Sequence, residues 1–195
     1  MKFILVLCGM SGSGKDTIQN LIKPIFKKMV SHTTRPKRVG EIDGEDYYFI
    51  TKEEFQVMKD NGDILEERKY DTLLNNNPET WHYGLSKKEL ESDTDDYLVI
   101  LDFKGIKQLL KNLDDDIKVF VCYLDATEET RKQRAIDRGS FSETEWNRRE
   151  KADMKSFDGC KEFANKIIDN NDKKPQEVAL KVLSKYARWR KIFND

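Results

Sequence analysis

Histidine and cysteine are scarce in this chain, and their scarcity excludes several kinds of chemistry. Among 195 residues there are two histidines and three cysteines. Cys8, Cys122 and Cys160 are odd in number and lack metal-ligand spacing, and two of them lie in apolar strand-like runs. We therefore expect reduced core residues of a cytoplasmic protein. Neither His32 nor His82 stands beside a residue that would indicate nucleophilic or metal chemistry, and no Ser/His/Asp or Cys/His set is identifiable.

Long apolar runs and an excess of one charge are also missing. Met-Lys is followed by only six apolar residues, Phe3–Cys8, too few for a signal-peptide core or a membrane span. Lys and Arg total 35 against 36 Asp and Glu, so no bulk attraction to nucleic acid is expected. The sequence thus predicts small-molecule partners, with neither nucleic acid nor membrane among them, and nothing in it sets the oligomeric state.

What is present is an alternation of short apolar runs and amphipathic helical stretches. This alternation is typical of a parallel sheet covered by helices. The predicted core strands are Phe3–Cys8, Tyr97–Leu101, Val119–Leu124 and Lys166–Asp169. Helices are predicted to begin after Thr127, after Ser142, and at Pro175, the last running through Ile192.

The segment after the first strand contains a helix breaker. Pro24 removes a hydrogen bond and moves the preceding residue out of the α region, so the first helix is predicted to end near Ile22. We expect Phe26–Ser31 to form a strand.

The middle third, from His32 to Ser86, has a hairpin-like pattern and is predicted to be an inserted subdomain. The expected features are turns at Asp43-Gly44 and Asn61-Gly62, strands at Tyr47–Ile50 and Asp63–Arg68, a helix from Thr51 with Glu54 as its capping box, and a surface loop at Asn75–Pro78.

The first chemical motif lies directly behind the first predicted strand. Residues Gly9–Thr17 read GMSGSGKDT and fit the phosphate-loop pattern G-x-x-x-x-G-K. The glycines let backbone N–H groups converge on an anion, the helix N-terminus adds positive potential, and Lys15 supplies a mobile charge. A solvated Gly/Ser turn is the alternative, but three glycines, the lysine and the preceding strand favour a nucleoside triphosphate site. Its predicted residues are Ser11, Gly12, Ser13, Gly14, Lys15, Asp16 and Thr17.

The second motif is a basic cluster between glycines. Arg35, Lys37 and Arg38 are followed by Gly40 and Gly44, which bend the chain back, and then by tyrosines. Two guanidinium forks and a phenol could converge on one phosphate dianion. A second phosphate site beside a phosphate loop favours phosphoryl transfer between two nucleotides over hydrolysis of one.

Three strings together carry a resemblance. The Gly-x-Ser-Gly-x-Gly-Lys loop, the string Ser-His-Thr-Thr-Arg-Pro-Lys-Arg-x-Gly-Glu at 31–41, and Asp-Gly-x-Asp-Tyr-x-Phe at 43–49 resemble guanylate kinase over nearly the whole chain. The resemblance implies an α/β P-loop NTPase three-layer fold with a parallel core sheet, an inserted mixed α/β monophosphate-binding subdomain and a helical lid. It implies a single kinase domain over 1–195, with core 1–30, 93–126 and 159–195, subdomain 31–92 and lid about 127–158. The implied reaction transfers the γ-phosphate of ATP, with Mg²⁺, to GMP or dGMP.

The resemblance also implies roles for individual residues. The acceptor phosphate would be held by Arg35, Arg38, Tyr47 and Tyr83, and guanine would be contacted by Ser31, Glu66 and Asp102. Guanine presents two adjacent donors, N1–H and N2–H₂, and a carboxylate such as Glu66 accepts both, whereas adenine lacks that pair. Glu66 could instead be an edge-strand carboxylate beside Arg68, and Asp102 could also cap a helix over Phe103–Leu113.

A run of arginines near residue 134 forms the third motif. Arg131, Arg134 and Arg138 share one helix face and could be a solvated charged surface. The resemblance implies instead that lid arginines close over the transferring phosphoryl group, where charge neutralisation and alignment carry catalysis. The predicted catalytic set is Lys15, Arg134, Arg138 and Arg149, with Arg149 preferred over Arg148 by spacing. Asn170 matches a position near the adenine of ATP.

Four departures from the family pattern stand close to these sites. Asp16 occupies the place of a Ser that helps to hold Mg²⁺, and its carboxylate is itself a possible Mg²⁺ ligand. Leu85 replaces a hydroxyl residue, Ile100 replaces an acidic residue, and the segment 70–80 is longer than usual. These departures keep a second acceptor open, another nucleoside monophosphate or a phosphorylated sugar. A non-catalytic guanylate-kinase-like interaction module is a third hypothesis. A regulatory GTPase is excluded because no N-K-x-D motif is present.

Overall fold

The computed structural model describes residues 1–74, 77–139 and 141–193, and these form two compact units. Unit 1 contains Met1–Lys27, Asp95–Lys104 and the chain from Asp116 onward, and unit 2 contains Lys28–Thr94 and Gly105–Asp115. In the described ranges, no helix is both long and apolar enough to cross a membrane.

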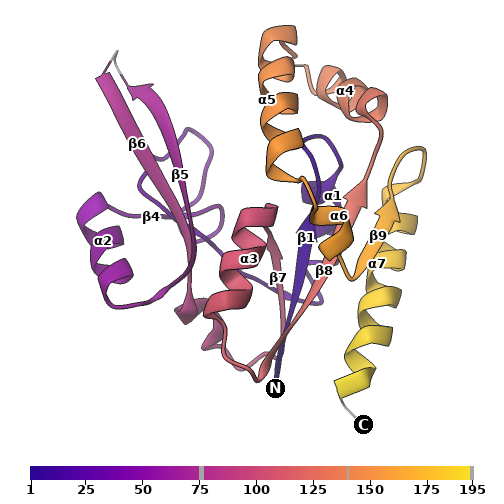
Figure 1. Ribbon diagram of the computed structural model, residues 1–195, viewed down its shortest axis with the longest axis horizontal. Coiled ribbons are helices and arrows are strands. Elements are labelled where there is room, and N and C mark those ends of the chain that lie inside the picture. The colour runs from indigo at the N-terminus through magenta and orange to yellow at the C-terminus, as the bar shows by residue number, and fades with distance from the viewer. Residues whose placement is uncertain (75–76, 140, 194–195) are drawn as a thin grey trace. The chain divides into compact units, whose positions relative to one another are not determined.

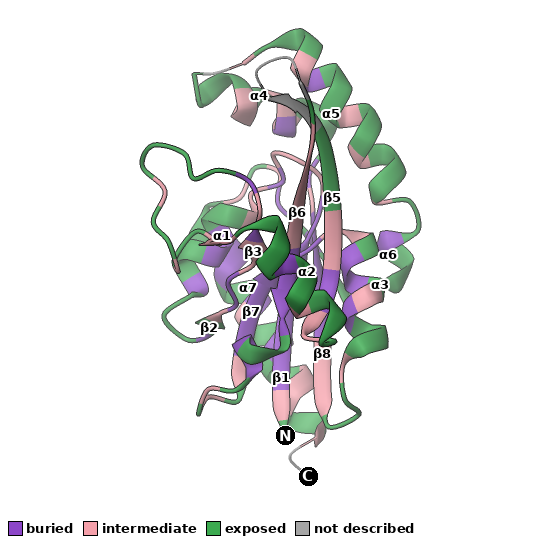
Figure 2. Ribbon diagram, turned by 90° about the vertical axis from the view of Figure 1, so that its left-hand side faces the viewer, coloured by how far each residue is buried: buried purple, intermediate pink, exposed green. Residues whose placement is uncertain are grey.

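Unit 1 is built on a sheet whose strands run in the order β2-β7-β1-β8-β9 (Figure 1). Its strands are β1 (Lys2–Cys8), β2 (Lys27–Lys28), β7 (Asp96–Ile100), β8 (Ile117–Asp125) and β9 (Lys166–Asp169). The central strand β1 pairs in parallel with β7 and β8, and β8 pairs in parallel with β9. Figure 2 shows β1 as mostly buried, which explains its continuous apolar run, because a central parallel strand is covered on both faces. The predicted parallel core sheet is confirmed.

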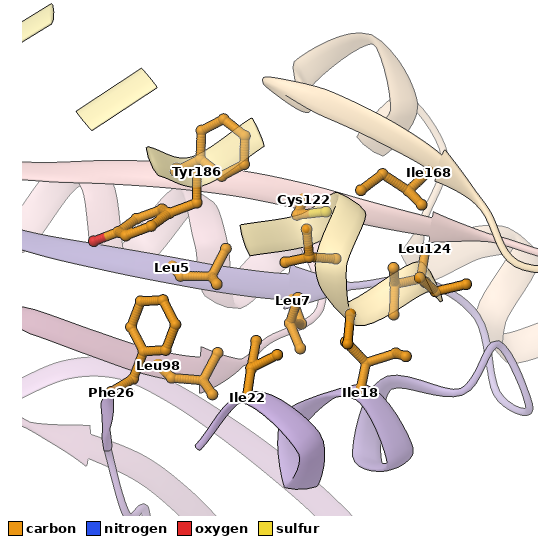
Figure 3. Packing of buried hydrophobic residues seen from close by; sticks show 14 of the residues in the cluster. Leu5, Leu7, Ile18, Ile22, Phe26, Leu98, Cys122, Leu124, Ile168 and Tyr186 are labelled. Atoms are coloured by element: carbon orange, nitrogen blue, oxygen red, sulfur yellow. The ribbon is translucent and has the colours of Figure 1, made fainter. Parts of the chain in front are cut away.

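Helices α1 (Lys15–Ile22) and α7 (Pro175–Arg190) pack together with the sheet. One cluster of buried side chains contains Ile18 and Ile22 of α1, Tyr186 of α7, and Leu5 and Leu7 of β1 (Figure 3). The Tyr186 hydroxyl donates to the Asp96 carboxylate at 2.6 Å, which ties α7 to β7. This packing holds the loop between β1 and α1 on a rigid base.

The remaining helices of unit 1 follow β8. They are α4 (Glu128–Asp137), α5 (Glu143–Ser156) and the short α6 (Cys160–Phe163), and the 3₁₀ turn η2 (Lys191–Phe193) ends the described chain. Thr127 accepts the Thr130 N–H and Ser142 accepts the Glu145 N–H, so both predicted N-caps are confirmed. Cys8, Cys122 and Cys160 are buried and form no disulfide.

Unit 2 contains a smaller sheet in the order β4-β3-β6-β5. Its strands are β3 (His32–Thr33), β4 (Tyr48–Phe49), β5 (Ile64–Leu74) and β6 (Asn77–Ser86). Helix α2 (Lys52–Asp60) carries the predicted Thr51–Glu54 capping box, and a 3₁₀ turn η1 (Lys87–Leu90) follows β6. Helix α3 (Phe103–Asn112) is divided between the units: Phe103 and Lys104 belong to unit 1, and the part from Gly105 onward belongs to unit 2.

The structure corrects the expected strand at Phe26–Ser31. Only Lys27–Lys28 pair as a strand, while Phe26 is buried with its ring 5.1 Å from that of Tyr186. The apolar residues of this segment were predicted to pair in a sheet, but Phe26 fills the core beneath α7 instead.

The hairpin of unit 2 also differs from its prediction. Strand β5 continues to Leu74, well past the predicted end at Arg68, because cross-strand contacts sustain it. The rings of Tyr70 and Trp81 stack at 6.1 Å, and Thr80 donates to Asp71 at 2.7 Å. Asn77 and Pro78 of the expected surface loop begin β6, whereas Asn75 and Asn76 lie outside the described residues. The Asn61-Gly62 turn lies where it was predicted, between α2 and β5.

Candidate functional site

The phosphate loop of unit 1 connects β1 to α1 through left-handed glycines. Gly12 has φ 80° and Gly14 has φ 91°. A Cβ at Gly12 would lie 2.8 Å from the Arg131 carbonyl oxygen, and one at Gly14 would lie 2.6 Å from Nδ2 of Asn170, so both glycines are required by close approach as well as by conformation. Gly14 is the N-cap of α1 and the described residues supply no side-chain cap, which leaves first-turn N–H groups for an anion.

Lys15 begins α1 and bends back over the loop. Its Nζ donates to the carbonyl oxygens of Gly9 at 2.7 Å and Met10 at 3.0 Å. Burial lowers the pKa of this ammonium, and the carboxylates of Asp16 and Asp153 partly oppose that effect. A desolvated cation held over an anion loop is suited to neutralise terminal phosphates.

Arg134 and Asn170 meet at the same loop. Arg134 donates to the Asn170 carbonyl at 2.7 Å and to the Gly12 carbonyl at 3.3 Å. Asn170 is 4% exposed, and its Nδ2 donates to the Ser13 carbonyl at 2.8 Å. Both side chains therefore support the loop backbone in this state, and their proposed roles toward ATP stay predictions.

Arg138 and Arg149 line a hollow of about 170 Å³ together with Ser11, Ser142 and Trp146. Nε of Arg149 donates to Glu145 at 2.7 Å, and Arg148 donates to the same carboxylate. These two arginines lower the pKa of Glu145 to about 2, so it stays ionised at neutral pH and keeps Arg149 paired. The structure brings Arg149, but not Arg148, to the lining of this hollow.

Asp16 and Thr17 lie exposed in the first turn of α1. A search of the described residues finds no group of three His, Cys, Asp or Glu side chains that could hold a metal. One carboxylate beside substrate phosphates is nevertheless a usual arrangement for Mg²⁺, which retains several waters, so Asp16 fits a metal carried by a nucleotide.

Two residues outside the predicted site set, Arg131 and Asp153, contact the loop, and Glu150 pairs with Arg131. Arg131 is only 3% exposed and forms a bidentate ion pair with Glu150, with both N–O distances 2.7 Å. Asp153 accepts the Ser11 N–H. Arg131 and Glu150 are 19 residues apart, so no local pattern could have predicted their ion pair. The sequence grouped Arg131 with Arg134 and Arg138 because the three share one helix face.

Unit 2 brings Tyr47 and Tyr83 to Arg35, whereas the fourth predicted acceptor residue, Arg38, is exposed. The Arg35 side chain is 4% exposed, its Nη2 lies 2.6 Å from the Glu41 carboxylate, and its guanidinium lies 5.6 Å from the Tyr47 ring centroid. The rings of Tyr47 and Tyr83 are 5.7 Å apart. Burial opposes the charge of Arg35, but hydrogen bonds with Glu41 and Tyr83 outweigh it and raise the Arg35 pKa. Burial also raises the pKa of Tyr47, which keeps its phenol protonated and able to donate.

Glu41 was not among the predicted site residues, yet it organises this cluster. Besides pairing with Arg35, its second oxygen accepts the backbone N–H of Arg38 at 2.8 Å. These donors, Arg35 first, lower the pKa of Glu41. Glu41 is a carboxylate held by one guanidinium N–H of Arg35 and one backbone N–H, which indicates that the cluster can bind an oxyanion.

The predicted base-contacting residues are distributed over both units. Glu66 lies in β5, is 1% exposed, and has an oxygen 3.3 Å from Nε of Arg68, so the expected neighbour is present. Ser31 directly precedes β3, and its carbonyl accepts the Tyr48 N–H. Asp102 belongs to unit 1 and directly precedes α3.

Comparison with known proteins identifies the family. The guanylate kinase family model matches residues 1–185. The chain belongs to the guanylate kinase family. It is 30% identical over 199 residues to the guanylate kinase of Clostridioides difficile strain 630, covering 97% of this chain and 92% of that protein. It is 29% identical to a guanylate kinase of Synechocystis, covering 86% of each.

A solved structure agrees with this family assignment. The crystal structure of guanylate kinase from Anaplasma phagocytophilum matches with a TM-score of 0.66 at 25% identity, covering 96% of this chain and 85% of that chain. The predicted class, a nucleoside monophosphate kinase of the guanylate kinase type, is thereby confirmed. Two departures from the family pattern have packing roles: Leu85 is fully buried in unit 2, and Ile100 packs against the core cluster of unit 1.

Proposed function

We propose that this guanylate kinase family member transfers the γ-phosphate of ATP, bound with Mg²⁺, to GMP or dGMP. The observation that carries the proposal is the Arg35 cluster, a second oxyanion site built in unit 2 in addition to the phosphate loop of unit 1. An enzyme that only hydrolysed a triphosphate would need the first site alone.

The proposed mechanism uses two anion sites, one for each reactant. The loop N–H groups and Lys15 hold the β- and γ-phosphates of the donor. Asp16 would help to hold Mg²⁺, which would supply charge neutralisation at the phosphates. Arg35, Arg38, Tyr47 and Tyr83 hold the acceptor phosphate, with Ser31, Glu66 and Asp102 at the base. Arg134, Arg138 and Arg149 belong to the proposed lid and stabilise the charge on the transferring phosphoryl group. No covalent intermediate is required, because positioning and charge neutralisation supply the catalysis.

The same proposal keeps the acceptor-binding subdomain at 31–92, within unit 2, and the lid at about 127–158, which contains α4 and α5. The cytoplasmic location and the restriction to nucleotide partners expected from the sequence stay predictions.

The decisive experiment measures ADP release from ATP with GMP, dGMP, AMP, UMP or CMP as acceptor. We expect GMP and dGMP to exceed AMP by roughly 10⁴-fold in kcat/KM, because a buried carboxylate left unpaired against adenine is costly. Lys15→Ala should bind GMP normally, as seen by calorimetry, but should release no ADP. This variant measures the background of the assay.

Other outcomes would redirect the proposal. Faster turnover with a pyrimidine nucleotide, or with a phosphorylated sugar added to the panel, would favour the second acceptor hypothesis. ATP binding without ADP release for any acceptor would contradict a kinase activity and favour a non-catalytic interaction module.

A further inference from the structure

The backbone of Ser11 in the phosphate loop is held on both sides, at its N–H and at its carbonyl, by helices of the same unit. Its N–H donates to Oδ2 of Asp153 in α5 at 2.5 Å. Its carbonyl accepts from Nη1 of Arg131 in α4 at 3.3 Å. The middle of the loop is thus bound by two charged side chains that the motif does not contain.

Asp153 occupies a donor that the loop would otherwise offer to a ligand. In a G-x-x-x-x-G-K loop the backbone N–H groups converge on phosphate oxygens, and Ser11 lies between Gly9 and Gly14. A carboxylate is an oxyanion of the same hydrogen-bonding type as phosphate. Asp153 also acts electrostatically on Lys15, whose pKa it helps to support against burial, so its charge faces the centre of the loop.

Arg131 is itself held in place by several interactions, so it can fix the Ser11 carbonyl. Its Nε donates to the Ala126 carbonyl at 3.2 Å, and its two Nη atoms share the Glu150 carboxylate. The guanidinium also lies 5.6 Å from the Trp146 ring centroid. An arginine this buried is retained only when it is paired, and the pairs here fix its direction toward Ser11.

We infer that Asp153 is an internal anion that holds the Ser11 N–H until a phosphate of the donor nucleotide displaces it. Arg131 meanwhile keeps the Ser11 carbonyl in place. The inference rests on the proposed function of the loop as the donor site. Asp153 is therefore a positioning residue that weakens donor binding: it must give up its hydrogen bond, and its charge opposes the incoming phosphates.

The test compares Asp153→Asn with Glu143→Gln, which removes a charge from the exposed start of the same helix, where Glu143 pairs with Lys132. Calorimetry measures binding of ATP and of inorganic tripolyphosphate, each with and without Mg²⁺ and without acceptor. Two charges about 5 Å apart in partly solvated surroundings predict roughly tenfold tighter binding of both ligands by Asp153→Asn. Glu143→Gln should bind as the unaltered protein does.

A kinetic split provides an independent readout. In Asp153→Asn the KM for ATP should fall about tenfold, while the KM for GMP should stay unchanged. Asp153→Ser, which keeps a small polar side chain without charge, should behave in the same way and guards against a folding defect specific to Asn.

Three results would overturn the inference. One is unchanged or weaker tripolyphosphate binding in both Asp153 variants at an unchanged thermal midpoint. A second is weaker ATP binding only when Mg²⁺ is present, which would make Asp153 a metal ligand. The third is an unaltered protein that binds neither ATP nor tripolyphosphate, in which case the proposed function fails as well. Binding of both ligands with no effect of Asp153 would leave the proposed function standing and remove this inference alone.

Discussion

At the scale of single residues, two buried arginines determine how the candidate site is built. Arg35 and Arg131 are both almost inaccessible to solvent, and each is paired with a glutamate. Their roles differ, since Arg35 belongs to the acceptor cluster, whereas Arg131 holds a loop carbonyl. A buried cation loses its hydration and is tolerated only when it is paired with an anion. Removal of either glutamate would therefore leave a buried arginine charge without its partner.

A residue-scale prediction concerns base recognition by Glu66. The Glu66→Gln variant replaces a carboxylate with an amide that has one acceptor and places a donor against guanine. We expect the KM for GMP to rise roughly 100-fold, because one or two hydrogen bonds to a charged group are lost. Steady-state kinetics with varied GMP would measure this.

The neighbouring residue supplies the control. Glu67 follows on the same strand but pairs with Lys59 and His82, and successive side chains of a strand point to opposite faces. Glu67→Gln should leave the KM for GMP nearly unchanged. Equal effects of the two substitutions would mean that Glu66 is not specific for the base.

At the scale of elements, local capping signals fixed where several helices begin. Thr51 and Glu54 exchange hydrogen bonds at the start of α2: the Glu54 N–H donates to Thr51 at 3.1 Å and the Thr51 N–H donates to Glu54 at 2.8 Å. Ser142 and Thr127 act similarly in α5 and α4. Each of these interactions joins residues three positions apart, so the sequence alone was enough to predict them.

The capping box gives a prediction about the stability of unit 2. Thr51→Ala should lower the free energy of unfolding by about 1 kcal/mol, because one first-turn N–H loses its acceptor. Urea denaturation would measure the loss, and hydrogen exchange of the α2 amides would locate it. Thr51→Ser retains the hydroxyl and should retain most of the stability, so an equal loss in both variants would contradict a capping role.

At the scale of the whole molecule, the core of unit 1 supports the phosphate loop. Strand β1 ends where the phosphate loop begins, and α1 begins where the loop ends. Leu7 and Ile18 are therefore near the loop in sequence, and both are fully buried. Displacement of either would move the loop backbone. Rigid elements on both sides are what make a glycine-rich anion site precise.

The whole-molecule prediction compares two leucines. Leu7→Ala should cost about 3 kcal/mol of unfolding free energy, because it removes buried methyl groups and leaves a cavity in the central strand. Leu180→Ala changes a residue of α7 that is 66% exposed and should cost less than about 0.5 kcal/mol. Urea denaturation followed by circular dichroism distinguishes them, and a similar loss at both positions would contradict this description of the core.

The sequence by itself determined the elements that depend on short-range patterns and the motifs that depend on spacing. Strand β9 begins and ends as predicted, and the helix starts after Thr127 and Ser142 and at Pro175 are confirmed, as is the family. The tertiary structure alone decided that Phe26 enters the core, that β5 extends to Leu74, and that Asp153 and Arg131 hold Ser11. Capping and periodicity depend on residues within one or two helical turns of each other. These tertiary contacts join residues that are further apart in the chain, and no local pattern predicts which of their side chains will meet.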